Sequence, residues 1–262
     1  MEVDLRLEDP PGGTPLERSC AMLDALPDDP PIAVLALPRR VVEDALRAFR
    51  IRLAPAKGDA CLALVGSAYG ARLLGVDVPS IQASLPWAED DAATAATLAT
   101  LWNLFPGAGA RVRPSAGSRF AIELADLPIA RLAGLDLVAE KRGGWLTAAT
   151  SASSLDKLRA APLTGRSVWR EGWQAACANR DAFAYLWLDL PALSKEYERL
   201  FALVRLVATF QPDLLDESLL ATLQGVSAVS RDLSTSGDLC IAGVRNGDAH
   251  RLFLSITPRP AP

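Results

Sequence analysis

One stretch of the sequence has the spacing of a known catalytic motif. Ser154 and Lys157 in SSLDK satisfy S-x-x-K, which in penicillin-binding enzymes brings a lysine amine within one helical turn of a nucleophilic serine. The companion motifs are missing, because the chain has no S-x-N sequence and neither LTGR nor STSGD supplies a K-T-G strand. Serines at the start of a helix are more typically caps. A serine hydrolase is therefore the last of three functional hypotheses.

Asp189 is a second candidate because it lies in the apolar run YLWLDLP. A carboxylate buried there would have a raised pKa unless it were paired. The alternatives are a place on the solvent face of the strand, or a cap on the next helix.

Tryptophans form a third group of candidates. Trp169 and Trp173 in WREGW share one helical face, which predicts packing in the core. Trp87, Trp145 and Trp187 are the aromatic residues that we expect to line a pocket, if the protein binds a small ligand.

Metal binding has little support in the sequence. His250 is the only histidine, which excludes sites built from several imidazoles. Asp28-Asp29 and Asp90-Asp91 could hold a divalent ion, but turns and helix starts also favour aspartate. We expect neither a metal nor a cofactor.

The composition argues against several classes of protein. Half of the 262 residues are hydrophobic and 22% are charged, which is typical of a folded chain. The net charge is -4 and the basic residues are scattered, so we expect no nucleic-acid partner. The longest apolar stretch, LFALVRLVATF, is short and contains Arg205, so we expect no membrane insertion.

Apolar runs that end in Leu-Pro precede amphipathic stretches. Such runs end at Pro38, Pro86, Pro128 and Pro191. Proline fits the first turn of a helix but cannot continue a central strand, so each pair predicts a strand that passes directly into a helix. Helices are expected over 14–26, 39–53, 88–105, 153–161, 167–177, 192–210 and 216–230, and hairpin turns at 142–144 and 246–248.

These elements predict an α+β fold of mainly antiparallel sheets with packed helices. Aligning Pro38 with Pro191 repeats the order helix, strand, Leu-Pro, helix, and Gly-Asp-x-Cys occurs at both Gly58 and Gly237. We therefore predict two related halves. The expected divisions are an N-terminal extension 1–13, a first half 14–118, a second half 119–257 and a disordered tail 258–262.

The chain has four cysteines, too few and too widely spaced for a disulfide framework. They are Cys20, Cys61, Cys177 and Cys240. Their apolar neighbours predict buried free thiols. A disulfide between Cys61 and Cys240 is the main alternative.

The order of strand, Leu-Pro, helix and closing hairpin, together with GGWLTAATSASSLDKL, resembles uncharacterised bacterial envelope proteins of the "domain of unknown function" kind. The resemblance extends over 14–257 and rests on the order of the elements. It implies duplicated halves and an export signal, and it supplies no functional residues. The sequence shows no such signal, so we expect a cytoplasmic protein if Met1 is the native start, and a periplasmic or envelope-associated one if the chain is trimmed.

These observations leave three functional hypotheses. The first is a non-enzymatic interaction or scaffold protein of a bacterial assembly, with a protein partner or a second copy of itself. The second is a small-molecule binding protein with its pocket between the two halves. The third is the hydrolase that uses Ser154 and Lys157.

Overall fold

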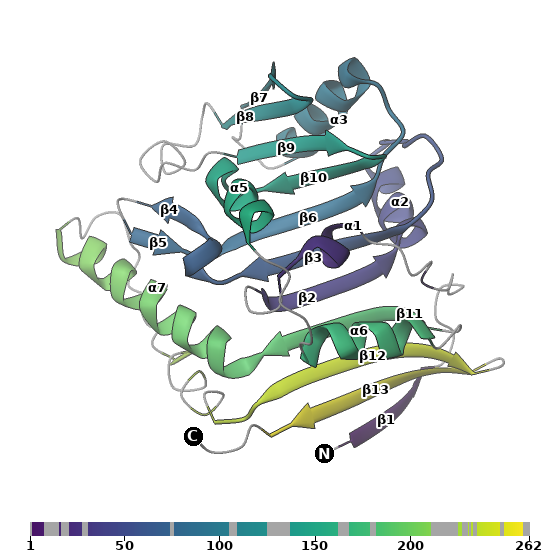
Figure 1. Cartoon of the computed structure of the whole chain (residues 1–262), viewed down its shortest axis with the longest axis vertical. Helices are drawn as coiled ribbons and strands as arrows, with labels where there is room; N and C mark the ends of the chain where they lie inside the picture. The colour runs from purple at the N-terminus through teal and green to yellow at the C-terminus, as the bar shows by residue number, and fades with distance from the viewer. Residues whose placement is uncertain are drawn as a thin grey trace.

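A large antiparallel sheet with helices packed against it dominates the computed structural model of this chain (Figure 1). The α+β class predicted from the sequence is confirmed. The structure describes residues 2–7, 16, 21–27, 31–73, 76–104, 109–124, 137–161, 168–178, 182–210, 225–226, 230, 232, 235–246 and 249–258.

The elements are labelled as in Figure 1. The strands are β1 (Glu2–Leu7), β2 (Pro31–Pro38), β3 (Asp59–Val65), β4 (Ala71–Leu73), β5 (Val76–Val78), β6 (Ser80–Pro86), β7 (Ala110–Ser115), β8 (Arg119–Leu124), β9 (Leu137–Arg142), β10 (Trp145–Ala149), β11 (Ala182–Asp189), β12 (Asp238–Asn246) and β13 (Ala249–Thr257). The helices are α1 (Ala21–Ala25), α2 (Arg39–Ala48), α3 (Asp91–Asn103), α5 (Ala152–Ala160), α6 (Val168–Ala178) and α7 (Leu190–Phe210), and a 3-10 turn, η1, spans Ser67–Tyr69.

The eleven strands of the main sheet run in the order β1-β13-β12-β11-β2-β3-β6-β10-β9-β8-β7, each antiparallel to its neighbours. The two strands that end in the Leu-Pro runs of Pro38 and Pro191, β2 and β11, are neighbours inside this sheet. Leu35 of β2 lies opposite Leu186 of β11. Strands β4 and β5 form a separate small sheet.

Helices cover the sheet according to the alternation of side chains along its strands. On one face, Val34 and Tyr185 pack with Trp169 and Trp173 of α6 and Leu23 of α1 in a buried cluster. Figure 1 shows α1, α5 and α6 in front of this face. The predicted core role of Trp169 and Trp173 is confirmed.

The opposite face has its own buried cluster at the β8–β10 end of the sheet. Phe120, Ile122 and Leu146 pack there with Leu98 of α3. Leu146 therefore faces α3. Its neighbour Trp145 packs on the first face, against the buried cluster of Val34, Tyr185, Trp169, Trp173 and Leu23, which we call the α1–α6 cluster. The side of the sheet on which a β10 side chain lies thus changes with each residue.

The Leu-Pro pairs lead into different local structures. β2 ends at Pro38 and α2 begins at Arg39, and β11 ends at Asp189 immediately before α7, so both pass directly from strand to helix. After Pro86 the chain continues without helix until Asp91, so that joint is not direct. Pro128 lies outside the described residues.

The predicted domain boundaries need two corrections. Residues 2–7 lie within the expected N-terminal extension, but they form β1, which pairs with β13 at the edge of the main sheet. The expected boundary between residues 118 and 119 falls in the tight turn of the β7–β8 hairpin, where Ser115 pairs with Arg119. A division there would separate two paired strands.

The predicted repeat aligned Pro38 with Pro191. When the ends of the two strands are aligned, Pro38 corresponds to Asp189, which lies two residues before Pro191. This shifted alignment also matches the two Gly-Asp-x-Cys sequences, because Asp59 pairs with Pro38 and Asp238 pairs with Asp189. Duplication of the two halves stays a prediction.

Candidate functional site

A cavity of about 570 Å³ opens between α1, α5 and the strands β6, β9 and β10. Its volume falls in the range of pockets that hold small ligands, roughly 300–1,000 Å³. The cavity lies on the face of the sheet that α1 and α6 cover, since it shares Met22, Leu26 and Leu158 with the cluster on that face. Its lining residues are Met22, Ala25, Leu26, Gln82, Glu140, Arg142, Gly143, Trp145, Thr147, Leu155, Leu158, Arg159 and Ala161.

The floor of the cavity consists of side chains from adjacent strands in register. Trp145 of β10 lies opposite Arg142 of β9, and Thr147 lies opposite Glu140. Because alternate residues of a strand share a face, these four side chains stand on the same side of the sheet. The hairpin turn between β9 and β10 contains Gly143 and Gly144 at φ values of 58° and 79°, as its glycines predicted.

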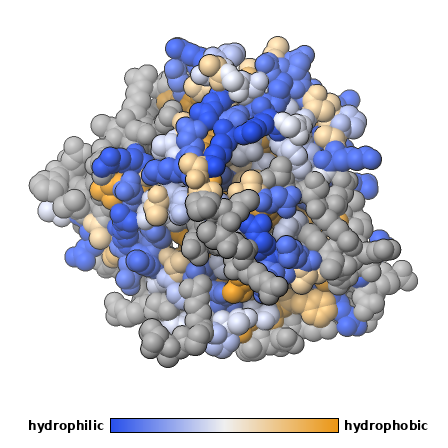
Figure 2. Space-filling view, viewed as in Figure 1, coloured by the Kyte–Doolittle hydropathy of each residue, from blue (hydrophilic) through white to orange (hydrophobic). Residues whose placement is uncertain are grey.

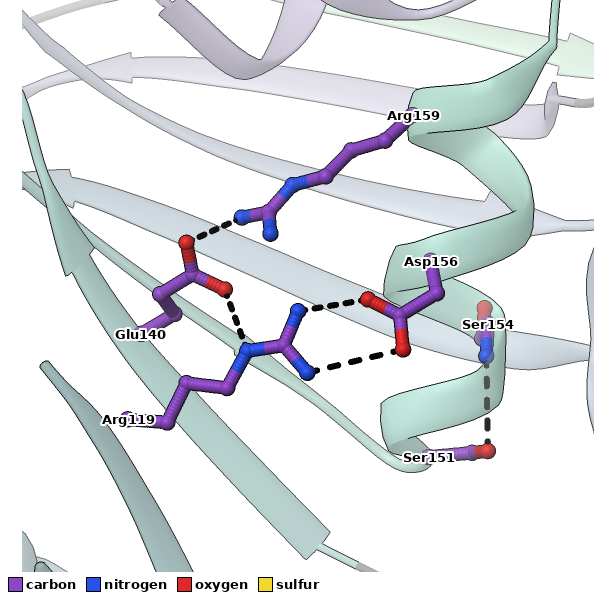
Figure 3. Close-up of polar contacts among 6 residues, drawn as sticks. All are labelled: Arg119, Glu140, Ser151, Ser154, Asp156 and Arg159. Atoms are coloured by element: carbon purple, nitrogen blue, oxygen red, sulfur yellow. Dashed lines mark hydrogen bonds and ion pairs between the residues drawn. The ribbon is translucent and has the colours of Figure 1, made fainter. Parts of the chain in front are cut away.

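Four charged side chains form a network beside this floor (Figure 3). Glu140 lies opposite Arg119 in the strand register, and Arg119 Nε donates to Glu140 Oε2 at 2.9 Å. The other end of the Arg119 guanidinium donates to Asp156 of α5, with 2.5 Å between Nη2 and Oδ1. Arg159, one turn further along α5, contacts Glu140 Oε1 at 2.5 Å. Arg119 and Glu140 on the sheet are thus linked by ion pairs to Asp156 and Arg159 on α5.

This network keeps Glu140 ionised although its side chain is only 7% exposed. Burial by itself would raise the pKa of Glu140, but the guanidinium groups of Arg159 and Arg119 outweigh it and hold the pKa below the ordinary value of 4.5. Hydrogen bonds from Arg119 likewise lower the pKa of Asp156. Both carboxylates therefore carry a full negative charge at neutral pH.

Arg142 differs from the other two arginines around the cavity. Its side chain is exposed. Among the residues that the structure describes, no ion pair or hydrogen bond of this side chain is found. Figure 2 shows mainly hydrophilic residues around α5 on this face of the molecule. Since Arg159 neutralises Glu140, Arg142 leaves the lining of the cavity with one positive charge.

Trp145 is the one predicted pocket tryptophan that the cavity contains. It is half-buried and packs against the α1–α6 cluster. Trp187 lies in the same cluster as a buried core residue, opposite Val34 and Cys240, and Trp87 is buried on the other face, where its indole donates to Thr94. The predicted wall of three tryptophans is therefore wrong for Trp87 and Trp187.

The S-x-x-K residues do not form a reactive pair. Ser154 is fully buried, and its hydroxyl donates to the Tyr69 carbonyl and accepts a hydrogen bond from Gln82 Nε2. Lys157 is exposed on α5. Ser151, and not Ser154, caps the helix by accepting a hydrogen bond from the Ser154 amide. Ser154 instead ties α5 to the floor of the cavity and to η1.

Asp189 is the N-terminal cap of α7. Its Oδ1 accepts a hydrogen bond from the Ala192 amide at 2.8 Å, which satisfies one of the free amides at the helix start. Of the interpretations that the sequence left open, the cap is confirmed. Asp90 has the same role in α3, where it accepts from the Ala93 amide.

The prediction of free thiols is wrong for Cys61 and confirmed for Cys240. Cys61 is disulfide-bonded, with a partner outside the described side chains, so it is not a free thiol. Cys240 is free, which excludes the alternative of a disulfide between Cys61 and Cys240. Burial raises the pKa of the Cys240 thiol. Cys240 is therefore a weakly reactive cysteine.

The remaining candidates from the sequence are His250 and the aspartate pairs. His250 is part of β13, opposite Arg245 and Leu7, and its side chain lies outside the described residues, as do Asp28 and Asp29. Asp91 pairs with Lys141. No group of metal-ligating side chains occurs within the described part of the chain.

Sequence reasoning missed the charged network entirely. Asp156 and Arg159 are spaced by one helical turn, which is a weak local signal for a shared face. Arg119 and Glu140 lie on different strands, and only the register of β8 with β9 places them opposite each other. No pattern within a short window contains that information.

Compared with known protein families, curated proteins and solved structures, the chain shows no match. None of the described helices is long and apolar enough to cross a membrane.

Proposed function

We propose that this protein binds a small molecule in the cavity between α1, α5 and the sheet. The observation that carries the proposal is a cavity of about 570 Å³ in which apolar side chains from two helices face charged side chains on the strands. Ligand pockets typically combine an apolar wall with a few fixed polar groups that orient the ligand. This is the second of the hypotheses drawn from the sequence.

The charged network supports this proposal because it holds the polar part of the cavity in place. Glu140 and Arg159 are both cavity residues, and each is restrained by the other. Arg119 and Asp156 restrain them in turn from outside the lining. A site whose polar groups are fixed before binding loses less conformational entropy when a ligand arrives.

A pair of tryptophan variants tests the proposal. Ala25→Trp places a large side chain at an exposed position of the cavity lining, whereas Ala160→Trp places one at an exposed position of α5 outside it. A metabolite library is screened by thermal shift against the unmodified protein and both variants. We expect at least one compound that stabilises the unmodified protein and Ala160→Trp but not Ala25→Trp. A library without any hit, or hits that Ala25→Trp retains, would contradict a ligand in this cavity.

The scaffold hypothesis stays a prediction beside this one. Analytical ultracentrifugation of the purified protein tests its self-association, and a monomer at all concentrations would remove that form of it. The hydroxyl of Ser154 is buried and already bonded to Tyr69 and Gln82, which argues against the hydrolase hypothesis.

The disulfide of Cys61 supports an oxidising compartment as the site of this function. Disulfides persist in secreted and periplasmic proteins and are rare in the cytoplasm. This agrees with the resemblance to bacterial envelope proteins and favours the second of the two predicted locations.

A further inference from the structure

The sign of the uncompensated charge in the cavity indicates the charge of its ligand. Both oxygens of Glu140 accept from guanidinium groups, Oε1 from Arg159 and Oε2 from Arg119. A cationic ligand at this carboxylate would lie beside two guanidinium groups that repel it. Arg142 has no such partner among the described residues, so its charge is open to a ligand anion.

The position of Arg142 suits an anion with an apolar body. Arg142 lies directly opposite Trp145 in the β9–β10 hairpin, so a group that reaches the guanidinium is adjacent to the indole ring. Beyond Trp145, the walls of the cavity include Leu26, which directly follows α1, and Leu155 and Leu158 of α5. The polar end and the apolar wall thus lie along one path through the cavity.

We propose that the ligand is a small amphiphilic carboxylate, held by Arg142 through its anionic group and by Trp145, Leu26, Leu155 and Leu158 through its acyl or aromatic body. This inference rests on the proposed function of the cavity. A guanidinium suits the role because its planar donors match both oxygens of a carboxylate. Arg142 is then the residue that selects the charge of the ligand, and the leucines select its apolarity.

A series of probes with one body and three head groups tests this inference. Octanoate, 1-octanol and octylammonium share an octyl chain and differ in charge, and binding of each is measured by isothermal titration calorimetry at low salt. We expect octanoate to bind at least tenfold more tightly than 1-octanol, and octylammonium to bind most weakly. Equal affinities for octanoate and 1-octanol, or a preference for octylammonium, would overturn the inference.

Variants of Arg142 test whether this residue causes the preference for octanoate over 1-octanol. Arg142→Gln is expected to weaken octanoate binding by roughly tenfold and to change 1-octanol binding by less than about twofold. Arg142→Lys keeps the charge without the planar fork and should retain part of the affinity. The matched control is Arg113→Gln, because Arg113 is also an exposed strand arginine but lies on β7 outside the lining.

Failure of this inference differs from failure of the proposed function. If 1-octanol binds as tightly as octanoate, and Ala25→Trp abolishes both, the cavity is a ligand site but not one for anions. If Arg142→Gln leaves octanoate binding unchanged, the anion is held elsewhere. If no octyl probe binds and no compound of the library does, the proposed function itself is wrong.

Discussion

The indole ring of Trp145 packs directly against Gly58, at the point where the chain enters β3. A β-carbon at Gly58 would lie 2.6 Å from Trp145 Cη2, closer than any relaxed contact, and 2.9 Å from Cγ of Pro86. The backbone of Gly58 also has a φ of 123°, a conformation that residues with side chains rarely adopt. Two requirements therefore favour glycine at position 58. The backbone has a positive φ, and the indole ring of Trp145 leaves no room for a side chain.

Gly58→Ala is accordingly expected to lower the free energy of unfolding by about 2–4 kcal/mol, from strain at φ and from overpacking against the ring. Urea denaturation followed by circular dichroism measures the loss. Gly143→Ala is the control, because Gly143 has a φ of 58° but nothing within 4 Å of its added β-carbon. That variant should lose only about 1 kcal/mol. Equal losses would show that contact with Trp145 adds nothing.

Glu140→Gln is expected to reduce stability at neutral pH by about 1–3 kcal/mol, because two arginines lose their charged partner. The pKa of Glu140 is lower in the folded than in the unfolded chain. Its ionisation therefore stabilises the fold above the unfolded pKa of about 4.5, and this contribution is lost as the pH falls through the folded pKa. The difference between the two proteins should then shrink.

Urea denaturation at pH 7 and at pH 3 measures that change. Glu123→Gln is the control, since Glu123 pairs with Arg113 on the surface, where both side chains are exposed to solvent. This substitution should cost less than about 0.5 kcal/mol at either pH. A Glu140→Gln penalty that is the same at both pH values would contradict the depressed pKa.

Ser154→Ala is expected to cost about 1–3 kcal/mol, because it leaves the buried amide of Gln82 and the carbonyl of Tyr69 without their partner. Lys157→Ala changes an exposed side chain and should stay within about 0.5 kcal/mol. Differential scanning fluorimetry compares the two. The structural role would be refuted by a hydrolytic turnover that both variants abolish while the melting temperature stays unchanged.

The disulfide of Cys61 predicts a thiol count. Four cysteines with one disulfide leave two reactive thiols in the denatured, unreduced protein, one of them Cys240, and reduction should release all four. Reduction should also lower stability by about 2–4 kcal/mol. Peptide mapping is expected to link Cys61 to Cys20 or Cys177. A Cys240→Ala variant that loses this link, or four reactive thiols before reduction, would contradict the assignment.

Several features of this protein were determined by short stretches of sequence. Asp90 and Asp189 cap the helices that begin beside them, because a side-chain oxygen next to a helix start reaches the free amides of its first turn. Trp169 and Trp173 are buried on one face of α6, since residues four positions apart share a helical face. The passage from strand to helix after Pro38 results from the fixed φ of proline.

Other features depend on segments that meet only in the folded chain. Glu2–Leu7 alternates polar and apolar residues, which is the pattern of a half-buried strand. Its place in the main sheet was missed because pairing with β13 joins opposite ends of the sequence. Trp145 and Trp187 both occupy strands with apolar neighbours, but only packing places the first at the cavity and the second in the core.

The candidate site shows the same division. The sequence by itself determined the β9–β10 hairpin and the helix that carries Asp156 and Arg159, because turn glycines and helical periodicity are local properties. Only the tertiary structure decided that Arg119 would face Glu140 and that α5 would lie over both. Strand register and helix docking depend on packing over the whole sheet, so the positions of these charges are set by contacts between distant segments.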